Sequence, residues 1–173
     1  WIIGKGNGLS YSSKPFILTS QYFGETWGGL SLENALRDYN IGNEICSLGV
    51  LTNKMDGVLE LDSKIVKDGK FVPQALLQYK VRCPYRITDF PFIPQSDFPN
   101  YIKNWDRFSK KYDEHHLIAA EVLIRNIRTL HDNGIIHNAI HAQNYTWALE
   151  LVDFESSRSN NFPYDNCEYE KYV

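Results

Sequence analysis

An asparagine and an aspartate near the end of the chain have the types and spacing of a metal–phosphate site. Asn144 closes a polar stretch, and Asp153 follows an apolar stretch nine positions later. A hairpin between them would return both side chains to one point. Two oxygen ligands meeting there suit Mg²⁺ bound to a triphosphate, because this ion takes few ligands from protein. The alternative is a surface loop followed by an aspartate that only caps a turn.

The same segment follows the spacing of protein kinases, which carry H-R-D-x-x-x-x-N and then D-F-G. Here His137, Asn144 and the run Asp153-Phe154-Glu155 stand at the corresponding places. The position of the kinase catalytic aspartate is Ala139, so the general base of that reaction is absent. Transfer chemistry at this site would rely on positioning and charge neutralisation.

A glycine-rich segment near the start of the chain is a second candidate. Lys5 lies between Gly4 and Gly6, and Gly8 follows two positions later. Glycines allow the backbone to approach a phosphate closely, and a lysine supplies a point charge. The segment fits neither the Walker A pattern nor the G-x-G-x-x-G fingerprint. The alternative is a glycine-rich turn with a solvated lysine.

Charged side chains in two other segments could complete such a site. Asp38 falls inside a predicted helix, where an acid that faces the sheet could hold the ammonium group of Lys5; Glu33 and Glu44 are rival candidates on that helix. Arg82 and Arg86 stand four positions apart, and arginine forks match phosphate oxygens. A solvated pair of arginines on a strand edge is the alternative.

Composition narrows the class of protein. The chain has 173 residues, 43% of them hydrophobic, and a net charge of −3, which argues against disorder and against general nucleic-acid binding. No apolar run is long enough to span a bilayer, so we expect no membrane partner. Three scattered cysteines predict thiols in a reducing compartment, the cytoplasm, although export as an effector remains compatible with them. His137 and His141 lack a third ligand, so zinc is not expected. Because the chain opens on Trp1, we expect a piece of a longer protein.

The elements that must position these residues predict an α+β fold. A helix should run from an N-cap at Ser31 to Gly49, and a second helix should carry an apolar face and end at Asn133-Gly134. The remaining expectations are short strands at Val58–Leu61, Phe71–Val72 and Ala75–Val81, a loop or an ordered linker from Pro84 to Pro99, an apolar helix face from Leu117 to Leu130, and a strand through Leu149 and Leu151. We therefore predict one domain of two lobes, a β-rich lobe over about 1–82 and a mostly helical lobe over about 83–173.

Four segments, taken in order, resemble the selenoprotein O family, protein adenylyltransferases with a pseudokinase fold. The stretch K-G-N-G-L-S-Y-S from Lys5 is similar to the family's K-G-A-G-R-T-P-Y-S, and L-R-D-Y around Asp38 is similar to I-R-E-F. The stretch L-G-V-L-T from Leu48 looks like L-G-I-P-T, and the segment from His137 to Asn144 looks like H-G-V-M-N-T-D-N. The resemblance spans about residues 3–155 and implies a minimal, truncated protein-kinase-like fold of two lobes.

The resemblance implies a role for each matching residue. It makes the chain an ATP- and metal-dependent transferase that moves AMP to a Ser, Thr or Tyr hydroxyl of a protein substrate. The implied nucleotide-binding residues are Lys5, Gly6, Gly8, Gly28, Arg82 and Arg86; the implied catalytic residues are Lys5, Asp38, Gln143 and Asp153; and the implied ligands of Mg²⁺ or Mn²⁺ are Asn144 and Asp153. Gln143 stands where the family has its proposed proton-accepting aspartate, and a Gln cannot take a proton. The alternatives are an inactive pseudokinase that binds nucleotide or a protein partner, and a minimal kinase that transfers the γ-phosphate.

Overall fold

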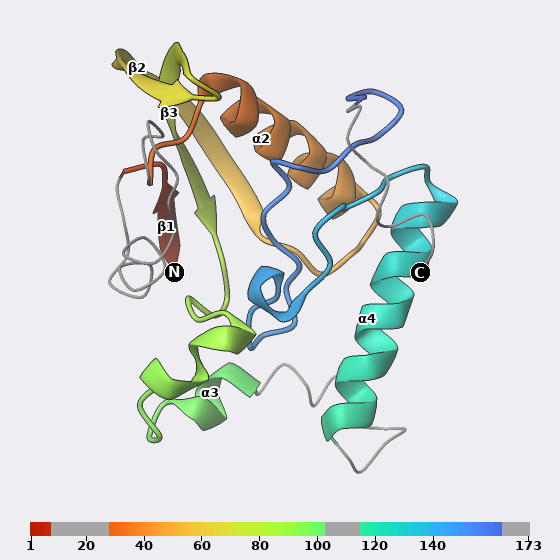
Figure 1. Ribbon diagram of the computed structural model, residues 1–173. Coiled ribbons are helices and arrows are strands. Elements are labelled where there is room, and N and C mark those ends of the chain that lie inside the picture. The colour runs from red at the N-terminus through yellow and green to blue at the C-terminus, as the bar shows by residue number, and fades with distance from the viewer. Residues whose placement is uncertain (8–27, 103–114, 164–173) are drawn as a thin grey trace.

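The computed structural model describes residues 1–7, 28–102 and 115–163 and confirms an α+β fold. Figure 1 shows a sheet on one side, helix α2 against it and helix α4 on the far side. The elements are β1 (Ile2–Lys5), α2 (Leu32–Ser47), β2 (Lys54–Lys67), β3 (Lys70–Lys80), a 3₁₀ turn η2 (Ile87–Phe92), α3 (Phe98–Ile102), α4 (His115–Asp132) and a 3₁₀ turn η4 (Ala142–Asn144).

The three strands form an antiparallel sheet in the order β1-β3-β2. The strands predicted separately at Val58–Leu61, Phe71–Val72 and Ala75–Val81 belong to one long hairpin of β2 and β3. Its turn lies at Asp68 and Gly69, which both have positive φ. Register shifts in β2 break the simple alternation that the sequence would need to reveal a strand of this length.

Helix α2 begins and ends where its sequence predicts. The Ser31 hydroxyl accepts a hydrogen bond from Asn34 N–H at 3.2 Å, and Gly49 follows the helix with φ +77°. The helix packs across β2 and β3. Gly42 makes this packing possible, because a Cβ there would lie 2.2 Å from Met55 Cε and 3.1 Å from Phe154 Cδ2.

The segment predicted as a loop or an ordered linker from Pro84 to Pro99 is an ordered connection that contains the 3₁₀ turn η2 and the start of α3. Pro91 fits inside the short turn, where one missing N–H donor costs little. Aromatic rings fix this region: Phe98 contacts Trp147 edge-on with ring centroids 4.9 Å apart.

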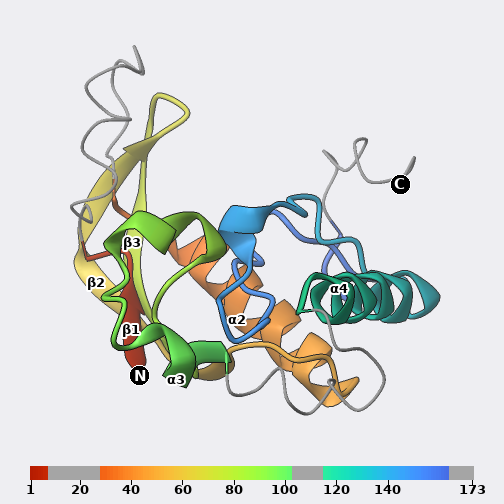
Figure 2. The ribbon, with the colours of Figure 1, turned by 90° about the horizontal axis from the view of Figure 1, so that it is seen from below.

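Helix α4 confirms the predicted helix and its end, since Gly134 has φ +70° just beyond it. The predicted apolar face is only partly right: the helix buries Ile118, Val122 and Leu130, whereas Leu117 and Ile124 are exposed. The segment 135–163 then lies between α4 and the layer of α2 and sheet (Figures 1 and 2). The predicted strand through Leu149 and Leu151 is absent. Leu151 makes only isolated bridges, to Thr52 and to Tyr145. The alternation of polar and apolar residues around Leu149 and Leu151 therefore reflects burial of this segment between other elements, not pairing within a sheet.

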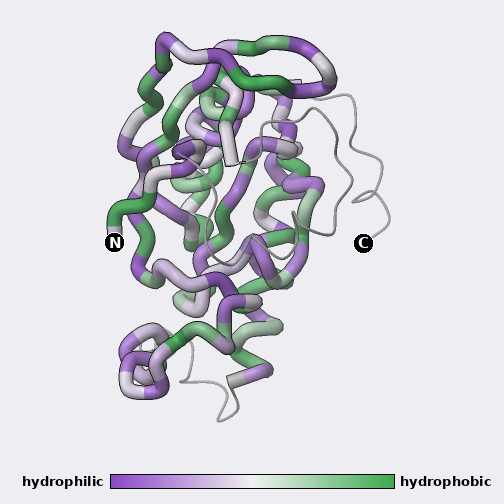
Figure 3. The backbone as a smooth tube through the Cα atoms, turned by 60° about the vertical axis from the view of Figure 1, so that its left-hand side comes forward, coloured by the Kyte–Doolittle hydropathy of each residue, from purple (hydrophilic) through white to green (hydrophobic). Residues whose placement is uncertain are grey.

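The main core joins the sheet, α2 and the segment 135–154. It includes Leu77 of β3, Ile41 of α2, and Phe154, all fully buried. Figure 3 shows polar and apolar residues interleaved along most of the backbone. Within the described ranges, no helix has the length and apolar character needed to cross a membrane.

A buried carboxylate anchors the chain where it leaves the sheet. Glu150 is 2% exposed, and its oxygens accept hydrogen bonds from Arg82 N–H at 2.9 and 3.0 Å and from Cys83 N–H at 3.3 Å. The Thr146 hydroxyl also donates to it, at 3.0 Å. Burial raises the pKa of Glu150, and these donors offset only part of that rise. Glu150 thus ties the residues after β3 to the segment that leads to Asp153.

We expect Glu150→Ala to lower the free energy of unfolding by about 2–4 kcal/mol, because it leaves backbone donors buried without their acceptor. Glu150→Gln keeps an acceptor oxygen and should lose about half as much. Urea unfolding followed by tryptophan fluorescence measures both. An alanine variant as stable as the wild type would contradict the anchoring role.

Candidate functional site

The ammonium group of Lys5 joins three carboxylates. Its Nζ lies 2.9 Å from Asp38 Oδ2 and 3.2 Å from Glu155 Oε2, and it also pairs with Asp153 Oδ1. The side chain of Asp38 is 1% exposed and that of Lys5 is 23% exposed, so the cluster runs from the core to the surface. One cation and three anions therefore share a site with an excess of negative charge.

Three different elements bring these groups together. Lys5 ends β1 and is the register partner of Leu77 in β3. Asp38 lies on the buried side of α2, where its Oδ1 also accepts a hydrogen bond from Phe154 N–H at 3.2 Å. Asp153 has φ +74°, a strained backbone conformation for a residue with a side chain. The same carboxylate of Asp38 thus holds both the lysine and the backbone beside Asp153.

The pairing of Lys5 with Asp38 agrees with the sequence prediction. The rival acids on α2 lie elsewhere: Glu33 faces Arg37 at 3.9 Å, and Glu44 accepts from the Ser159 hydroxyl at 2.8 Å. Their positions follow from helical periodicity, because only Asp38 falls on the side that faces the sheet and Phe154.

The charges in this cluster shift two pKa values. Burial lowers the pKa of the Lys5 ammonium, but Asp38, Asp153 and Glu155 together outweigh burial and hold it well above its ordinary value. Burial raises the pKa of Asp153, yet Lys5, with a smaller effect from Arg86, brings it below its ordinary value. At neutral pH, Lys5 is therefore charged and Asp153 ionised.

Asn144 lies in the 3₁₀ turn η4 and is buried. Its Nδ2 donates to the Ala139 carbonyl at 3.0 Å, and its own carbonyl accepts from Val152 N–H at 3.0 Å. The second bond brings Val152, the residue before Asp153, next to Asn144. The chain therefore turns back between these two positions, as predicted. Oδ1 is the amide atom suited to a cation, because the amide oxygen carries the acceptor lone pairs and Nδ2 only donates.

Asn144 and Asp153 carry the oxygen donors of this segment that could hold a metal ion. Asn144 Oδ1 and a carboxylate oxygen of Asp153 are the donor types that Mg²⁺ and Mn²⁺ prefer. Within the described ranges, no group of three or more His, Cys, Asp and Glu side chains is placed to hold a metal ion. A site with so few protein ligands needs oxygens from another molecule to complete it.

His137 supports this segment from inside. It is fully buried, its Nε2 lies 3.1 Å from the Val152 carbonyl oxygen, and its ring contacts Phe154 edge-on with centroids 5.4 Å apart. Its burial and contacts identify it as a positioning residue for the backbone around Asp153. His141, by contrast, is exposed.

The structure separates the two predicted phosphate-binding arginines. Arg86 donates to the Gln143 carbonyl at 3.3 Å and lies close enough to Asp153 to lower its pKa. Arg82 instead lines a cavity at the end of the sheet with Lys54. Gln143 is exposed, and its main chain rather than its amide contacts Arg86.

Two of the glycines predicted to bind nucleotide, Gly6 and Gly28, are required by the local backbone. Gly6 has φ +98°, and a Cβ there would lie 2.6 Å from the Ala75 carbonyl oxygen and 2.7 Å from Leu30 Cβ. Gly28 lies in a turn with φ +74°. Gly8 lies outside the described residues. Close packing alone therefore explains Gly6, whether or not a phosphate approaches it.

Glu155 is a partner of Lys5 that the sequence motifs did not predict. It stands two positions after Asp153, where the kinase pattern has a glycine. An acid in that place of a D-F-G-like run was a signal in the sequence, because it adds a second carboxylate next to the first.

The sequence matches no protein-family model, and no curated protein matches it closely enough to be reported as a relative.

The lowered pKa of Asp153 predicts how stability responds to acid. Its contribution is fully present above the unfolded-state pKa of about 4 and is lost as pH falls through the lower folded-state value. Asp153→Asn cannot titrate, so its free energy of unfolding should fall less between pH 5 and pH 2 than that of the wild type. Urea unfolding across this range measures the difference. Asp62→Asn, at an exposed position of β2, is the control and should behave as the wild type; parallel wild-type and Asp153→Asn curves would contradict the assignment.

Proposed function

We propose that this chain is an ATP- and metal-dependent transferase of the selenoprotein O type, with a kinase-like arrangement of two lobes, that moves AMP to a hydroxyl of a protein substrate. One observation carries the proposal: Lys5, from the edge strand, binds both the helix acid Asp38 and the loop acid Asp153. A strand lysine, a helix acid and a metal-binding loop acid are the parts that position a triphosphate in kinases.

The excess negative charge supports the metal requirement. Asp38, Asp153 and Glu155 surround a single ammonium group. Asn144 and Asp153 would hold the Mg²⁺ or Mn²⁺ ion of the metal–ATP complex, and its charge would let Lys5 exchange Asp153 for the phosphate oxygens while it keeps Asp38. Lys5 thus acts as the counter-ion of Asp153 until the nucleotide arrives.

The motifs and Arg86 support transfer of AMP over transfer of phosphate. In our proposal Arg86 holds the outer phosphates, which leaves the α-phosphorus facing the acceptor. The hydroxyl oxygen then attacks the α-phosphorus, pyrophosphate leaves, and the hydroxyl proton passes to water or to the exposed His141. Neither Ala139 nor Gln143 can accept it. General-base help is worth about 10²–10⁴-fold, so the reaction should be slow rather than absent.

Lys5→Ala and Asp38→Ala should each weaken ATP binding about 10- to 100-fold, and the double variant should be little worse, because the two residues act as one pair. Calorimetry in Mg²⁺ measures the affinities, and EDTA should remove binding by the wild type. Glu33→Ala is the matched control on α2, since its carboxylate lies at the surface.

A silent Asp38→Ala variant would contradict the shared role of the pair. Equal ATP affinity with and without EDTA would contradict the metal assignment. Asp38→Asn keeps an acceptor for Phe154 N–H and serves as a second variant if the alanine chain does not fold.

Label from ATP radiolabelled at the α-phosphate, but not at the γ-phosphate, should be incorporated into protein. Asp153→Ala should abolish incorporation, and Gln143→Asp should raise it, by up to about 10²-fold, because it restores a carboxylate. Label from the γ-phosphate would favour a minimal kinase instead. ATP binding with no label from either position would favour the inactive pseudokinase.

A further inference from the structure

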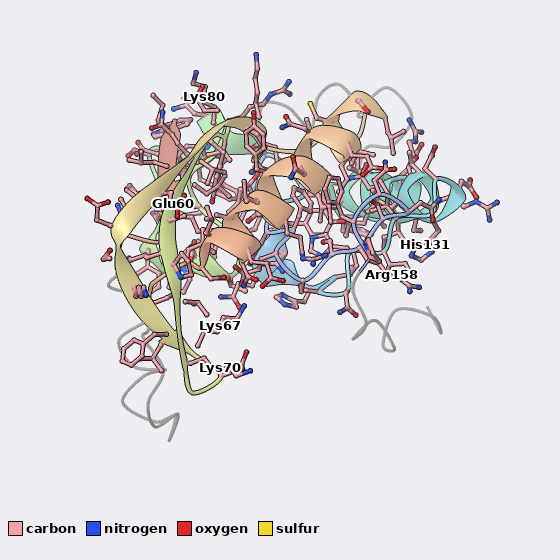
Figure 4. The ribbon with its side chains drawn as sticks, turned by 90° about the horizontal axis from the view of Figure 1, so that it is seen from above. Glu60, Lys67, Lys70, Lys80, His131 and Arg158 are labelled. Carbon is pink, nitrogen blue, oxygen red and sulfur yellow. The ribbon has the colours of Figure 1, made fainter. Side chains whose placement is uncertain are left out.

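A cavity of about 660 Å³ lies at the end of the sheet where β2 begins and β3 ends. Figure 4 shows Lys80 at this end, far from the hairpin tip where Lys67 and Lys70 lie. Small-molecule sites commonly have volumes of about 300–1,000 Å³. Lys5 does not line this cavity and neither do its carboxylate partners, so it is separate from the site described above.

Three cationic side chains line the cavity: Lys54, Lys80 and Arg82. Lys54 and Lys80 are register partners in the antiparallel pair of β2 and β3, so both leave the same face of the sheet. Like charges opposite each other destabilise such a pair of strands. Asp56 offsets part of this repulsion through an exposed ion pair with Lys80 at 3.1 Å. A bound anion would offset the rest.

The other walls of the cavity are largely apolar and come from Val50, Leu51 and Val81. Glu150 also lines it, but the carboxylate oxygens are already acceptors for main-chain N–H groups. The cavity thus presents positive charge on one side and apolar surface on another. That combination suits a molecule with an anionic group and an apolar body.

We propose that this cavity binds a small organic phosphate. The phosphate group lies among the three cations, where the Arg82 guanidinium can take two oxygens and the lysines add point charges. The apolar body of the ligand lies against Val50 and Leu51. This proposal is independent of the transferase activity, because the cavity contains none of the residues assigned to it.

The thiol of Cys46 reports occupancy directly, since it lines the cavity and is exposed, whereas Cys83 is buried. Phenyl phosphate is the probe, and alkylation of Cys46 by neutral N-ethylmaleimide is followed by peptide mass spectrometry. At a probe concentration about ten times its dissociation constant, we expect about tenfold slower alkylation of Cys46. Inorganic phosphate and phenol, each carrying one half of the ligand, should protect less at the same concentration.

The variant Lys54→Gln with Lys80→Gln should lose this protection. Lys64→Gln with Lys70→Gln removes the same charge from exposed positions of the same two strands and should keep it. Arg82→Gln tests the site if the first variant does not fold. Three results would overturn the proposal: no protection of the wild type, unchanged protection in the lysine or arginine variants, or equal protection by inorganic phosphate. A double variant that only loses stability, with no protection in the wild type, would mean that these cations contribute to stability alone.

Discussion

The ammonium group of Lys5 balances carboxylates that belong to two distant parts of the chain. Asp38 is almost fully buried, and an unpaired buried charge costs several kcal/mol, so the edge strand must stay where Lys5 reaches it. The second oxygen of Asp38 holds Phe154 N–H and so fixes the backbone beside Asp153. Strand β1, helix α2 and the segment after Leu151 are therefore positioned relative to one another by a single cluster of charges. Much of the remaining structure serves to bring these three elements within reach.

Local signals predicted much of this arrangement. Ser31 and Gly49 mark the ends of α2 because a cap depends on a few neighbouring residues. Helical periodicity likewise places Asp38, rather than Glu33 or Glu44, toward the sheet. The sequence predicted an acid of this helix as the partner of Lys5 and named Asp38, Glu33 and Glu44, and the face that packs on the sheet decides among the three.

Features that depend on contacts between residues far apart in the chain could not be predicted from the sequence. The residues around Leu151 alternate like a strand, but α2 and the sheet bury them without a neighbouring strand to pair with. Arg82 and Arg86 were predicted to bind phosphate together because they are close in sequence. In the structure Arg82 lines the cavity at the end of the sheet, whereas Arg86 donates to the Gln143 carbonyl. The sequence did not indicate the role of Glu150, because the N–H groups that donate to its carboxylate belong to Arg82 and Cys83, 68 and 67 positions away.

The sequence separation of the central ion pair determines when this site can form during synthesis of the protein. Lys5 and Asp153 are 148 positions apart, so nearly the whole described chain must leave the ribosome before they can meet. Folding dominated by such remote contacts is slow, because the entropy cost of closing a long loop comes before the stabilisation from the contact. During synthesis, the helix that carries Asp38 can form early, but its carboxylate has no finished site to enter. A growing chain therefore cannot assemble this charge cluster, and whatever chemistry it supports begins only after translation has passed residue 153.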